Sequence, residues 1–468
     1  MLSHKGHDRT APVAICTLAQ YILYSGIFNM KESRFIVSQA GKEFGTILIY
    51  STFSTSLVEL EENIYKTIFE DSKYDVYPTE VAALYEMGFL IDDDYDELAY
   101  LESLRCQTLE SNKTSPTYYI ICPTTGCNAR CYYCFEKGVQ QRKMQKETAE
   151  AVADYIIANH DEEHLIIQWF GGEPLLEPDI ISLIVNKLHQ HGVRFDSKII
   201  TNGSLLNEEI VKCAAEEWNV KIIQVTIDAL FEEYNCIKDY MGLKQDPFEL
   251  VMSNIQRCLD HEINIRIRIN FNPLENEKAI RTVNYLRDRF GGDKNFFVYL
   301  APIDSVDIPS ITGEFEKENK HPLIQLLDAE NDFCSFGNYD SRTENSSEYE
   351  AILKKYYLTP IPTSCYGGCK SSLTIDSSGN IFDCHRLLGH EIYASGNVFD
   401  GREDGETASF FSDPYLHDDE CKGCNLLPLC QGGCKYRAMT YGKGHACTFV
   451  KGAVKELIMR AANEINAL

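Results

Sequence analysis

The segment TTGCNARCYYCFEKG, residues 124–138, places three cysteines within eight residues: Cys127, Cys131 and Cys134. Their C-x3-C-x2-C spacing suits an iron-sulfur cube better than zinc, because structural zinc sites need four ligands and usually contain C-x2-C pairs. Three thiolates occupy three irons of a cube and leave the fourth iron open. The alternatives are a structural zinc site or three cysteines that share no role.

A second group of eight cysteines lies between residues 365 and 447, and this clustering points to metal rather than to disulfides. Eight thiols are enough for two fully ligated 4Fe-4S clusters. A zinc ribbon built on the C-x2-C pair is the alternative, but it leaves the other cysteines unexplained. The expected ligands are Cys365, Cys369, Cys384, Cys421, Cys424, Cys430, Cys434 and Cys447.

The other seven cysteines show no metal-ligand spacing. We expect them to be small buried hydrophobic residues, of which Cys122 lies close to the first motif. They are Cys16, Cys106, Cys122, Cys213, Cys236, Cys258 and Cys334.

Composition excludes several classes of partner. The chain has 468 residues with 44 basic and 70 acidic side chains, so its net charge of −26 has the wrong sign for binding nucleic acid. The segment APVAICTLAQYILY follows Lys5 and Arg9 and faintly resembles a secretory signal, but Thr17 and Gln20 interrupt it. No apolar run reaches the length of a membrane span. We therefore expect a soluble, cytoplasmic protein that binds neither nucleic acid nor membrane.

Strand and helix patterns alternate regularly from Pro116 onward. The segments YYIIC, HLIIQWF, SKIIT, VKIIQVTI, INIRIRINF and FFVYLA read as strands, with amphipathic helices such as KETAEAVADYIIANH and DPFELVMSNIQRCLDH between them. Six successive β/α units predict an α/β fold with a parallel sheet curled into a partial barrel. Its ligand should lie at the carboxyl ends of the strands, where the Cys127 motif follows the first strand.

The chain divides into four zones. Residues 1–112 read as a small α+β domain, and residues 113–302 as the partial barrel. Residues 303–364 form an acidic linker with a short helix after SRTENSSEYE, and residues 365–468 are rich in cysteine and glycine. The last zone is poor in long periodic elements, so its folding should depend on bound metal.

Polar residues and glycines follow the expected strand ends. Gly171, Gly172 and Glu173 follow the second strand, where glycine permits a close backbone approach. In INIRIRINF the isoleucines occupy one face, while Arg266 and Arg268 occupy the other. An inner barrel face with two arginines should hold an anionic or polar ligand; a surface ion pair is the alternative for Arg268.

Around Cys127 the sequence resembles the radical S-adenosylmethionine (SAM) enzymes, whose signature is this spacing with an aromatic residue before the last cysteine, here Tyr133. The resemblance implies a partial (β/α)6 TIM-like barrel in which SAM chelates the open iron. Reduction then releases a 5′-deoxyadenosyl radical. The positions that match SAM contacts of the family are Tyr133, Gly171, Gly172, Glu173, Asn202 and Thr226. Arg268, near the carboxyl end of the fifth strand, is expected to contact a carboxylate of SAM or of the substrate.

One position departs from the pattern of these enzymes. Many relatives carry an H-D-x-x-R-like sequence after the fourth strand, and the corresponding segment here runs from Tyr234 to Lys238. If Lys238 stands in for the arginine, it supplies charge without a bidentate fork.

The C-terminal spacing, with Gly379 between Cys369 and Cys384, resembles the seven-cysteine SPASM domain. The resemblance implies two auxiliary iron-sulfur clusters, so that the cofactors are SAM and three 4Fe-4S clusters. It assigns Cys365, Cys369, Cys384 and Cys434 to the first auxiliary cluster. It assigns Cys421, Cys424, Cys430 and Cys447 to the second.

The stretch GNIFDCHR, followed by Leu-Leu-Gly, is similar to a stretch of ranthipeptide/SCIFF-type maturases, which form thioether bridges in ribosomally made, cysteine-rich peptides. In many such enzymes a winged-helix-like N-terminal domain holds the leader of the precursor peptide through an added strand. Residues 1–112 fit that role; a purely structural extension is the alternative.

The resemblance thus implies a peptide maturase that joins a cysteine sulfur to a carbon of an acceptor residue. Its partners would be a precursor peptide with a leader and an electron donor such as flavodoxin or ferredoxin. Alternatives are a sulfatase-type formylglycine maturase or a carbon-carbon peptide crosslinking enzyme. A non-catalytic iron-sulfur or zinc scaffold is the alternative from another class.

Iron content tests the division of the ligands. Replacing Cys127, Cys131 and Cys134 together with alanine should remove one third of the iron and all SAM cleavage, because only that cluster has an open iron. Iron analysis and 5′-deoxyadenosine assays of anaerobically reconstituted protein measure both. Continued SAM cleavage in the triple variant would refute the assignment.

Overall fold

The computed structural model describes residues 29–111, 116–160, 164–272, 276–303, 324, 334–336, 347–361, 371–402, 411, 418–440, 445–447 and 449–467. At its centre is a nine-stranded sheet in the order β12-β11-β10-β9-β8-β7-β6-β13-β14. The six strands predicted from sequence are confirmed, and each pairs in parallel with the next along the chain. Their bounds are β6 (Tyr118–Ile121), β7 (Leu165–Trp169), β8 (Phe195–Thr201), β9 (Val220–Thr226), β10 (Asn264–Phe271) and β11 (Phe296–Pro302).

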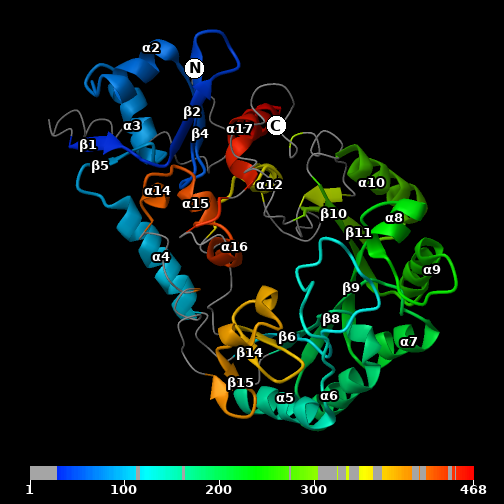
Figure 1. Cartoon of the computed structure of the whole chain (residues 1–468). Helices are drawn as coiled ribbons and strands as arrows, with labels where there is room; N and C mark the ends of the chain where they lie inside the picture. Colours follow the sequence, from blue (N-terminus) through cyan, green and yellow to red (C-terminus); the bar gives the residue numbers. More distant parts are fainter. Residues whose placement is uncertain are drawn as a thin grey trace.

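Helices follow these strands and form an arc along one side of the sheet (Figure 1). On β10 the isoleucines 265, 267 and 269 are fully buried on the helix-covered face, in one core with α9 residues such as Val251. The alternate β10 residues Arg266 and Arg268 are half-buried on the inner face. No helix of the described part of the chain is long and apolar enough to cross a membrane. The helices are α5 (Lys146–Asn159), α6 (Pro178–Gln190), α7 (Glu208–Glu216), α8 (Phe231–Lys238), α9 (Pro247–Asp260) and α10 (Asn276–Phe290).

The C-terminal region shares the central sheet. Strand β13 (Ser372–Ile375) pairs in parallel with β6, and β14 (Ile381–Phe382) pairs with β13 in the antiparallel sense. At the opposite edge β12 (Cys334–Phe336), from the acidic zone, pairs with β11. The short helix expected after SRTENSSEYE (341–350) is α12 (Glu348–Lys355), which begins with a capping box within the last residues of that stretch. Backbone pairing thus places the segment before Cys384 beside the strand that leads into the Cys127 motif.

The N-terminal region contains an antiparallel sheet, β2-β3-β4, and a β1-β5 pair. Its own core includes Ile49, Ile68, Val81 and Phe89, all fully buried. The elements are β1 (Met30–Glu32), β2 (Ile36–Ala40), β3 (Thr46–Ser51), β4 (Leu57–Glu61), α2 (Glu62–Tyr65) with a π-helical turn, α3 (Pro78–Glu86), β5 (Leu90–Asp92) and α4 (Glu97–Ser111).

This N-terminal region packs against the cysteine-rich C-terminal region, which contains α14 (Asp419–Lys422), α15 (Leu427–Cys430), α16 (Lys435–Thr440) and α17 (Val454–Ile465) (Figure 1). Phe35 shares a small core with Leu101, Cys421 and Leu427. The Asn425 amide donates to the Ile36 carbonyl at 2.8 Å, which continues the contact along β2. The N-terminal region therefore supports the segment that carries Cys421.

Phe35 tests this support. Its side chain is fully buried, so Phe35→Ala should lower the free energy of unfolding by about 3–5 kcal/mol and reduce the retained iron. Phe44 is fully exposed in the same region, and Phe44→Ala should change neither quantity. Urea unfolding and iron analysis measure both. If Phe35→Ala lost stability but kept all its iron, the packing contact would have no bearing on the cysteine-rich region.

Candidate functional site

The three cysteines of the first motif lie in one loop that follows the carboxyl end of β6. The Cys134 amide donates to the Cys131 carbonyl at 3.2 Å, and the Arg130 amide donates to the Lys238 carbonyl at 2.7 Å. Burial raises the pKa of the Cys127 thiol to about 12 and raises that of Cys134. Thiols held in this way ionise when they coordinate a metal, so the donor set fits an iron-sulfur cluster.

Gly171 and Gly172, directly after β7, touch the backbone of the cluster loop. A Cβ on Gly172 would come within 2.2 Å of the Gly126 carbonyl oxygen, and one on Gly171 would come within 2.5 Å of the Thr124 oxygen. Gly171 also has a φ of +126°, in the region that favours glycine. Glycine is thus required at both positions by the close approach of the cluster-loop backbone. The SAM contact predicted for these glycines stays a prediction.

Glu173 joins three segments around the cluster loop. Its fully buried carboxylate accepts hydrogen bonds from the Leu175 amide, the Thr201 hydroxyl and the Asn202 amide at 2.8–3.1 Å. Its own amide donates to the Gly126 carbonyl at 2.8 Å. Burial raises the pKa of Glu173 to about 7, against these hydrogen bonds. Its described contacts orient the loop, while its predicted contact with SAM stays a prediction.

Asn202 also holds the loop. Its amide nitrogen donates to the Asn128 side chain at 2.8 Å and lies 4.0 Å from the Cys127 sulfur. Its side-chain oxygen accepts from the Ser204 amide and hydroxyl. These contacts hold the Asn202 side chain against the loop that carries Cys127, and its predicted contact with SAM stays a prediction.

A buried ion pair lies behind the cluster loop. The Lys238 ammonium is 2.8 Å from the Asp228 carboxylate, and both side chains are 2% exposed. The Tyr133 hydroxyl donates to the same carboxylate at 2.5 Å, and the Asn270 amide donates to its other oxygen at 3.1 Å. Burial by itself would lower the pKa of Lys238. The Asp228 carboxylate and the nearby phenols and Cys131 thiol raise it by more, so the net pKa of Lys238 lies above its usual value. Lys238 is therefore a buried ammonium that ties Tyr133 to the end of β9.

The remaining predicted strand-end residues line the inner face of the sheet. Thr226 and Arg268 pair in register on β9 and β10, and both are half-buried. The Arg268 guanidinium donates to the Asn270 side chain at 2.7 Å. Lys198, which sequence reasoning missed, lies on the same face of β8, and burial together with Arg266 and Arg268 lowers its pKa to about 8. The inner face is thus rich in positive charge.

The segment after β14 reaches the cluster loop from the C-terminal region. The His385 ring lies edge-on to Phe170 at 5.2 Å and to Phe135 at 6.2 Å. The Arg386 guanidinium stacks on Phe135 at 4.5 Å and on Tyr436 at 4.8 Å. Burial lowers the pKa of His385 to about 4, and the positive charges of Arg386, Arg268 and Lys198 add to this effect. The residue after Cys384 therefore faces the same space as the strand ends.

Glu136 is a second residue that sequence reasoning missed. It lies in the cluster loop, is 9% exposed, and its Oε2 has no hydrogen-bond partner within the described part of the chain. Burial raises its pKa to about 7. No spacing rule singles out one glutamate in a loop, so only the structure could find it.

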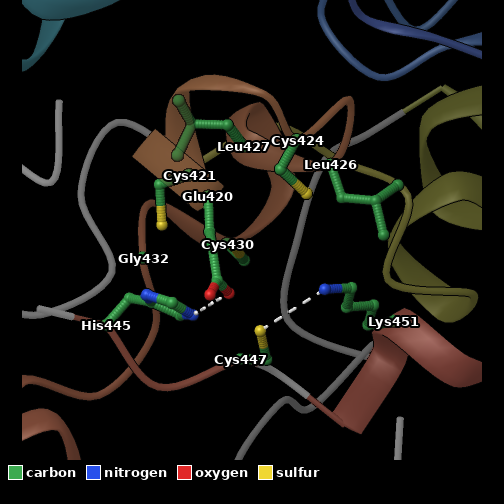
Figure 2. Close-up of a pocket in the computed structure, with 10 residues that line it drawn as sticks. All are labelled: Glu420, Cys421, Cys424, Leu426, Leu427, Cys430, Gly432, His445, Cys447 and Lys451. Atoms are coloured by element: carbon green, nitrogen blue, oxygen red, sulfur yellow. Dashed lines mark hydrogen bonds and ion pairs between the residues drawn. The ribbon is translucent and has the colours of Figure 1, made fainter. Parts of the chain in front are cut away.

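Four cysteines from the C-terminal region line one pocket (Figure 2). The sulfur atoms of Cys421, Cys424 and Cys447 point toward its middle, and Cys430 completes the lining. Burial and the neighbouring charges raise the pKa of Cys421 to about 12 and that of Cys430 to about 11. These are the four ligands that the sequence assigned to one auxiliary cluster, and their common pocket fits a four-thiolate metal centre.

Charged side chains surround this pocket. The Lys451 ammonium lies 3.6 Å from the Cys447 sulfur, and the His445 ring lies 3.3 Å from the Glu420 carboxylate (Figure 2). The other ring nitrogen of His445 lies 2.7 Å from the Asp418 carboxylate. Ligand atoms of Asp418, Cys421 and His445 also lie within 4.8 Å of one another. A positive group beside a cluster sulfur is one of the means by which proteins set a cluster's potential.

The other auxiliary ligand set is described only in part. Cys384 and Cys434 lie in the described residues, whereas Cys365 and Cys369 lie outside them. Of the seven cysteines expected to be buried, Cys122 and Cys258 are buried and Cys213 is half-buried. The expectation was wrong for Cys106 and Cys236, which are exposed on α4 and α8. Cys16 and the side chain of Cys334 lie outside the described part.

Comparison with known proteins agrees with the cluster loop and the parallel sheet. Residues 121–286 match the family model of the radical SAM superfamily, and this part of the chain is a radical SAM domain. Such a domain binds SAM and a 4Fe-4S cluster. The matched residues run from the end of β6 to α10 and therefore include the cluster loop and the strand ends described above.

Two curated relatives cover most of the chain at low identity. The cysteine-type anaerobic sulfatase-maturating enzyme of Clostridium novyi (strain NT) is 25% identical over 335 residues, which are 67% of this chain and 86% of the relative. The radical SAM cyclopropyl synthase TigE of Paramaledivibacter caminithermalis is 22% identical over 477 residues, 91% of this chain and 95% of the relative.

A solved structure shares the fold. Histidine-tagged anSMEcpe with bound AdoMet is similar with a TM-score of 0.58 and 20% identity, over 75% of this chain and 98% of that one. Native anSMEcpe with bound AdoMet and the Cp18Cys peptide has a TM-score of 0.55 over 75% of this chain and 99% of that one, also at 20% identity.

The buried ion pair yields a test. Lys238→Met leaves Asp228 buried without its cation and should lower the free energy of unfolding by about 3–5 kcal/mol. A Lys238→Met/Asp228→Leu double variant removes both charges and should recover most of that loss. Lys66→Met breaks the exposed Lys66–Glu62 pair and should change little. Urea unfolding of the four proteins measures these effects; wild-type stability of Lys238→Met would contradict the ion pair's role.

Proposed function

We propose that this protein is a radical SAM enzyme that modifies a ribosomally made precursor peptide and forms thioether crosslinks in it. The observation that carries the proposal is the contact of His385 with Phe135 and Phe170. It places the residue after Cys384, a proposed auxiliary-cluster ligand, against the loop that carries Cys127, Cys131 and Cys134. Two proposed iron-sulfur centres thus flank one polar space at the strand ends.

The relatives support a peptide or protein as the substrate class. One is named a sulfatase-maturating enzyme, and anSMEcpe has been solved with a bound peptide. The precursor peptide of this chain would carry a leader and a cysteine-rich core. The GNIFDCHR stretch (379–386) includes β14 and the turn after it. Its similarity to thioether-forming maturases supports thioether chemistry.

The residues hold the groups that carry the reaction. When bound, SAM and the cluster at Cys127, Cys131 and Cys134 supply a 5′-deoxyadenosyl radical. The Asp228–Lys238 pair, Glu173 and Asn202 hold the loop that presents these thiols. In the peptide, the acceptor carbon gives up one hydrogen atom and the cysteine thiol one proton as the carbon-sulfur bond forms. Auxiliary clusters held by the C-terminal cysteines would accept the surplus electron, and an electron donor such as flavodoxin or ferredoxin would supply the electron that reduces the first cluster.

We propose three 4Fe-4S clusters in all. The pocket of Cys421, Cys424, Cys430 and Cys447 supports one fully ligated auxiliary cluster. The other would use Cys384 and Cys434 together with Cys365 and Cys369. Full thiolate ligation favours electron transfer over capture of the substrate thiol as the task of both.

The N-terminal region supports leader binding by strand addition. In its β2-β3-β4 sheet, strand β2 is tied to the C-terminal region by two hydrogen bonds. The Asn425 side chain donates to the Ile36 carbonyl of β2, and the Gln39 side chain of β2 donates to the Lys455 carbonyl. The opposite outer strand, β4, pairs only with β3 among the described strands. A leader segment could therefore extend the sheet beside β4.

A second candidate is supported by the relatives rather than by the site. TigE, a cyclopropyl synthase, covers nearly the whole chain, which favours carbon-carbon bond formation. The sulfatase-maturating relatives favour oxidation of a cysteine or serine to formylglycine.

Product analysis separates these outcomes. With SAM, a reductant and the peptide encoded by a neighbouring short, cysteine-rich reading frame, each thioether should remove two hydrogens and one iodoacetamide-reactive thiol. Mass spectrometry with and without alkylation measures both. The Cys127/Cys131/Cys134 triple alanine variant is the control and should give unmodified peptide.

Other results would reject the thioether. Loss of hydrogens with unchanged thiol reactivity would indicate a carbon-carbon bond, while loss of sulfur with a new aldehyde would indicate formylglycine. A protein that carries its clusters but does not cleave SAM would instead support the scaffold alternative.

A further inference from the structure

The inner face of the sheet carries three cations on two strands. Strand register places Lys198 level with Ile222, and Arg266 and Arg268 level with Gln224 and Thr226. Side chains alternate along a strand, so these even-numbered residues of β8, β9 and β10 share one face. The isoleucines of β10 that alternate with the arginines are buried in the core under the helices, which assigns the cations to the inner face.

Two glutamines on this face are paired with tyrosine hydroxyls. The Tyr118 hydroxyl donates to Gln168 at 2.9 Å, and the Tyr299 hydroxyl donates to Gln224 at 2.8 Å. In contrast, the Lys198 ammonium has no hydrogen bond or ion pair within the part of the chain that the structure describes. Burial and the two arginines lower its pKa to about 8, as expected for a cation that lacks a counter-charge.

Three carboxylates, on β8 and just after β9 and β13, are engaged with other groups. Asp196, two residues before Lys198, lies 3.0 Å from His164 and 3.9 Å from Lys221. Asp228 is paired with Lys238, and Asp376 accepts hydrogen bonds from Asn380 and Ser378. None of these carboxylates is left to neutralise Lys198.

The position of Lys198 separates it from the SAM site. Lys198 lies four residues before Asn202, which is roughly 13 Å along an extended strand from the level of the cluster loop. Arg268 is nearer the strand ends and is held by its hydrogen bond to Asn270. The cations thus lie on the inner face below the strand ends, where a substrate that reaches the radical site would be placed.

We propose that Lys198, together with Arg266 and Arg268, binds a carboxylate of the peptide substrate. The carboxylate belongs to an Asp or Glu side chain near the modified residue or to the peptide's C-terminus. This inference rests on the proposed function, because it names the substrate group that the same site receives. Lys198 is accordingly a specificity-determining residue rather than a ligand of SAM.

Three synthetic probes test the proposal on the reconstituted holoenzyme with SAM. The first is Ac-Cys-Gly-Gly-Asp-Gly-NH2, the second has Asn in place of Asp, and the third has Asn and a free C-terminal acid. Equilibrium dialysis without reductant measures binding alone. The wild-type protein should bind an acid probe about 10-fold tighter than the neutral probe, because a charge-assisted hydrogen bond is gained. Whichever acid probe shows the preference identifies the source of the carboxylate.

Matched variants assign the effect. Lys198→Met should abolish the preference for the acid probe, while Lys198→Arg should keep it. Lys221→Met is the control, because Lys221 is exposed and lies on the other face of β9. SAM affinity and iron content should be unchanged in all three variants, which separates substrate binding from assembly of the radical site.

Two results would overturn the inference: equal binding of all three probes by the wild type, or an intact acid preference in Lys198→Met. Binding is measured without turnover, so this test is independent of the product analysis. A carboxylate preference without thioether products would reject only the proposed reaction, and thioether products without the preference would reject only the carboxylate site.

Discussion

The cluster loop has no regular secondary structure of its own, so its geometry depends on buried polar anchors at the strand ends. One of these anchors is the Asp228–Lys238 pair, whose two side chains are each 2% exposed. Charges removed from water persist only when their partners satisfy them, and here Tyr133 and the Asn270 amide complete the set around Asp228. A loop tied to such a pair has few alternative positions, which suits a site where three thiols must converge.

Glu173 acts at the opposite side of the loop by the same physical means. Its carboxylate accepts three donors from the ends of β7 and β8, while its amide holds Gly126. The glycines before it bring two backbones closer than any Cβ allows. The loop is therefore positioned by hydrogen bonds and close backbone contact with neighbouring strand ends rather than by packing of its own side chains.

The same sheet brings the distant parts of the chain together. Because β13 pairs with β6, the segment with Cys384 and His385 begins beside the strand that leads into the cluster loop. Phe35 packs against Cys421, so the N-terminal region supports the second group of cysteines. Between them the inner face of the sheet carries Lys198, Arg266 and Arg268, while Asp196 lies near His164 and Asp228 is paired with Lys238. This arrangement leaves a positively charged space in a protein whose net charge is −26.

The sequence by itself determined the elements and the chemistry of the ligands. The hydrophobic periods of strands and helices are local, so the six strands and the main helices could be predicted from the pattern of apolar residues. The Cys127 motif could be predicted because its cysteines are closely spaced within one loop. What only the tertiary structure decided is long-range: the pairing of β13 with β6, the burial of Lys238 against Asp228, and the isolation of Lys198. Cys106 and Cys236 show the same limit, because exposure depends on which face of a helix meets the core. Such outcomes depend on which side chains meet in space, and no local pattern encodes that.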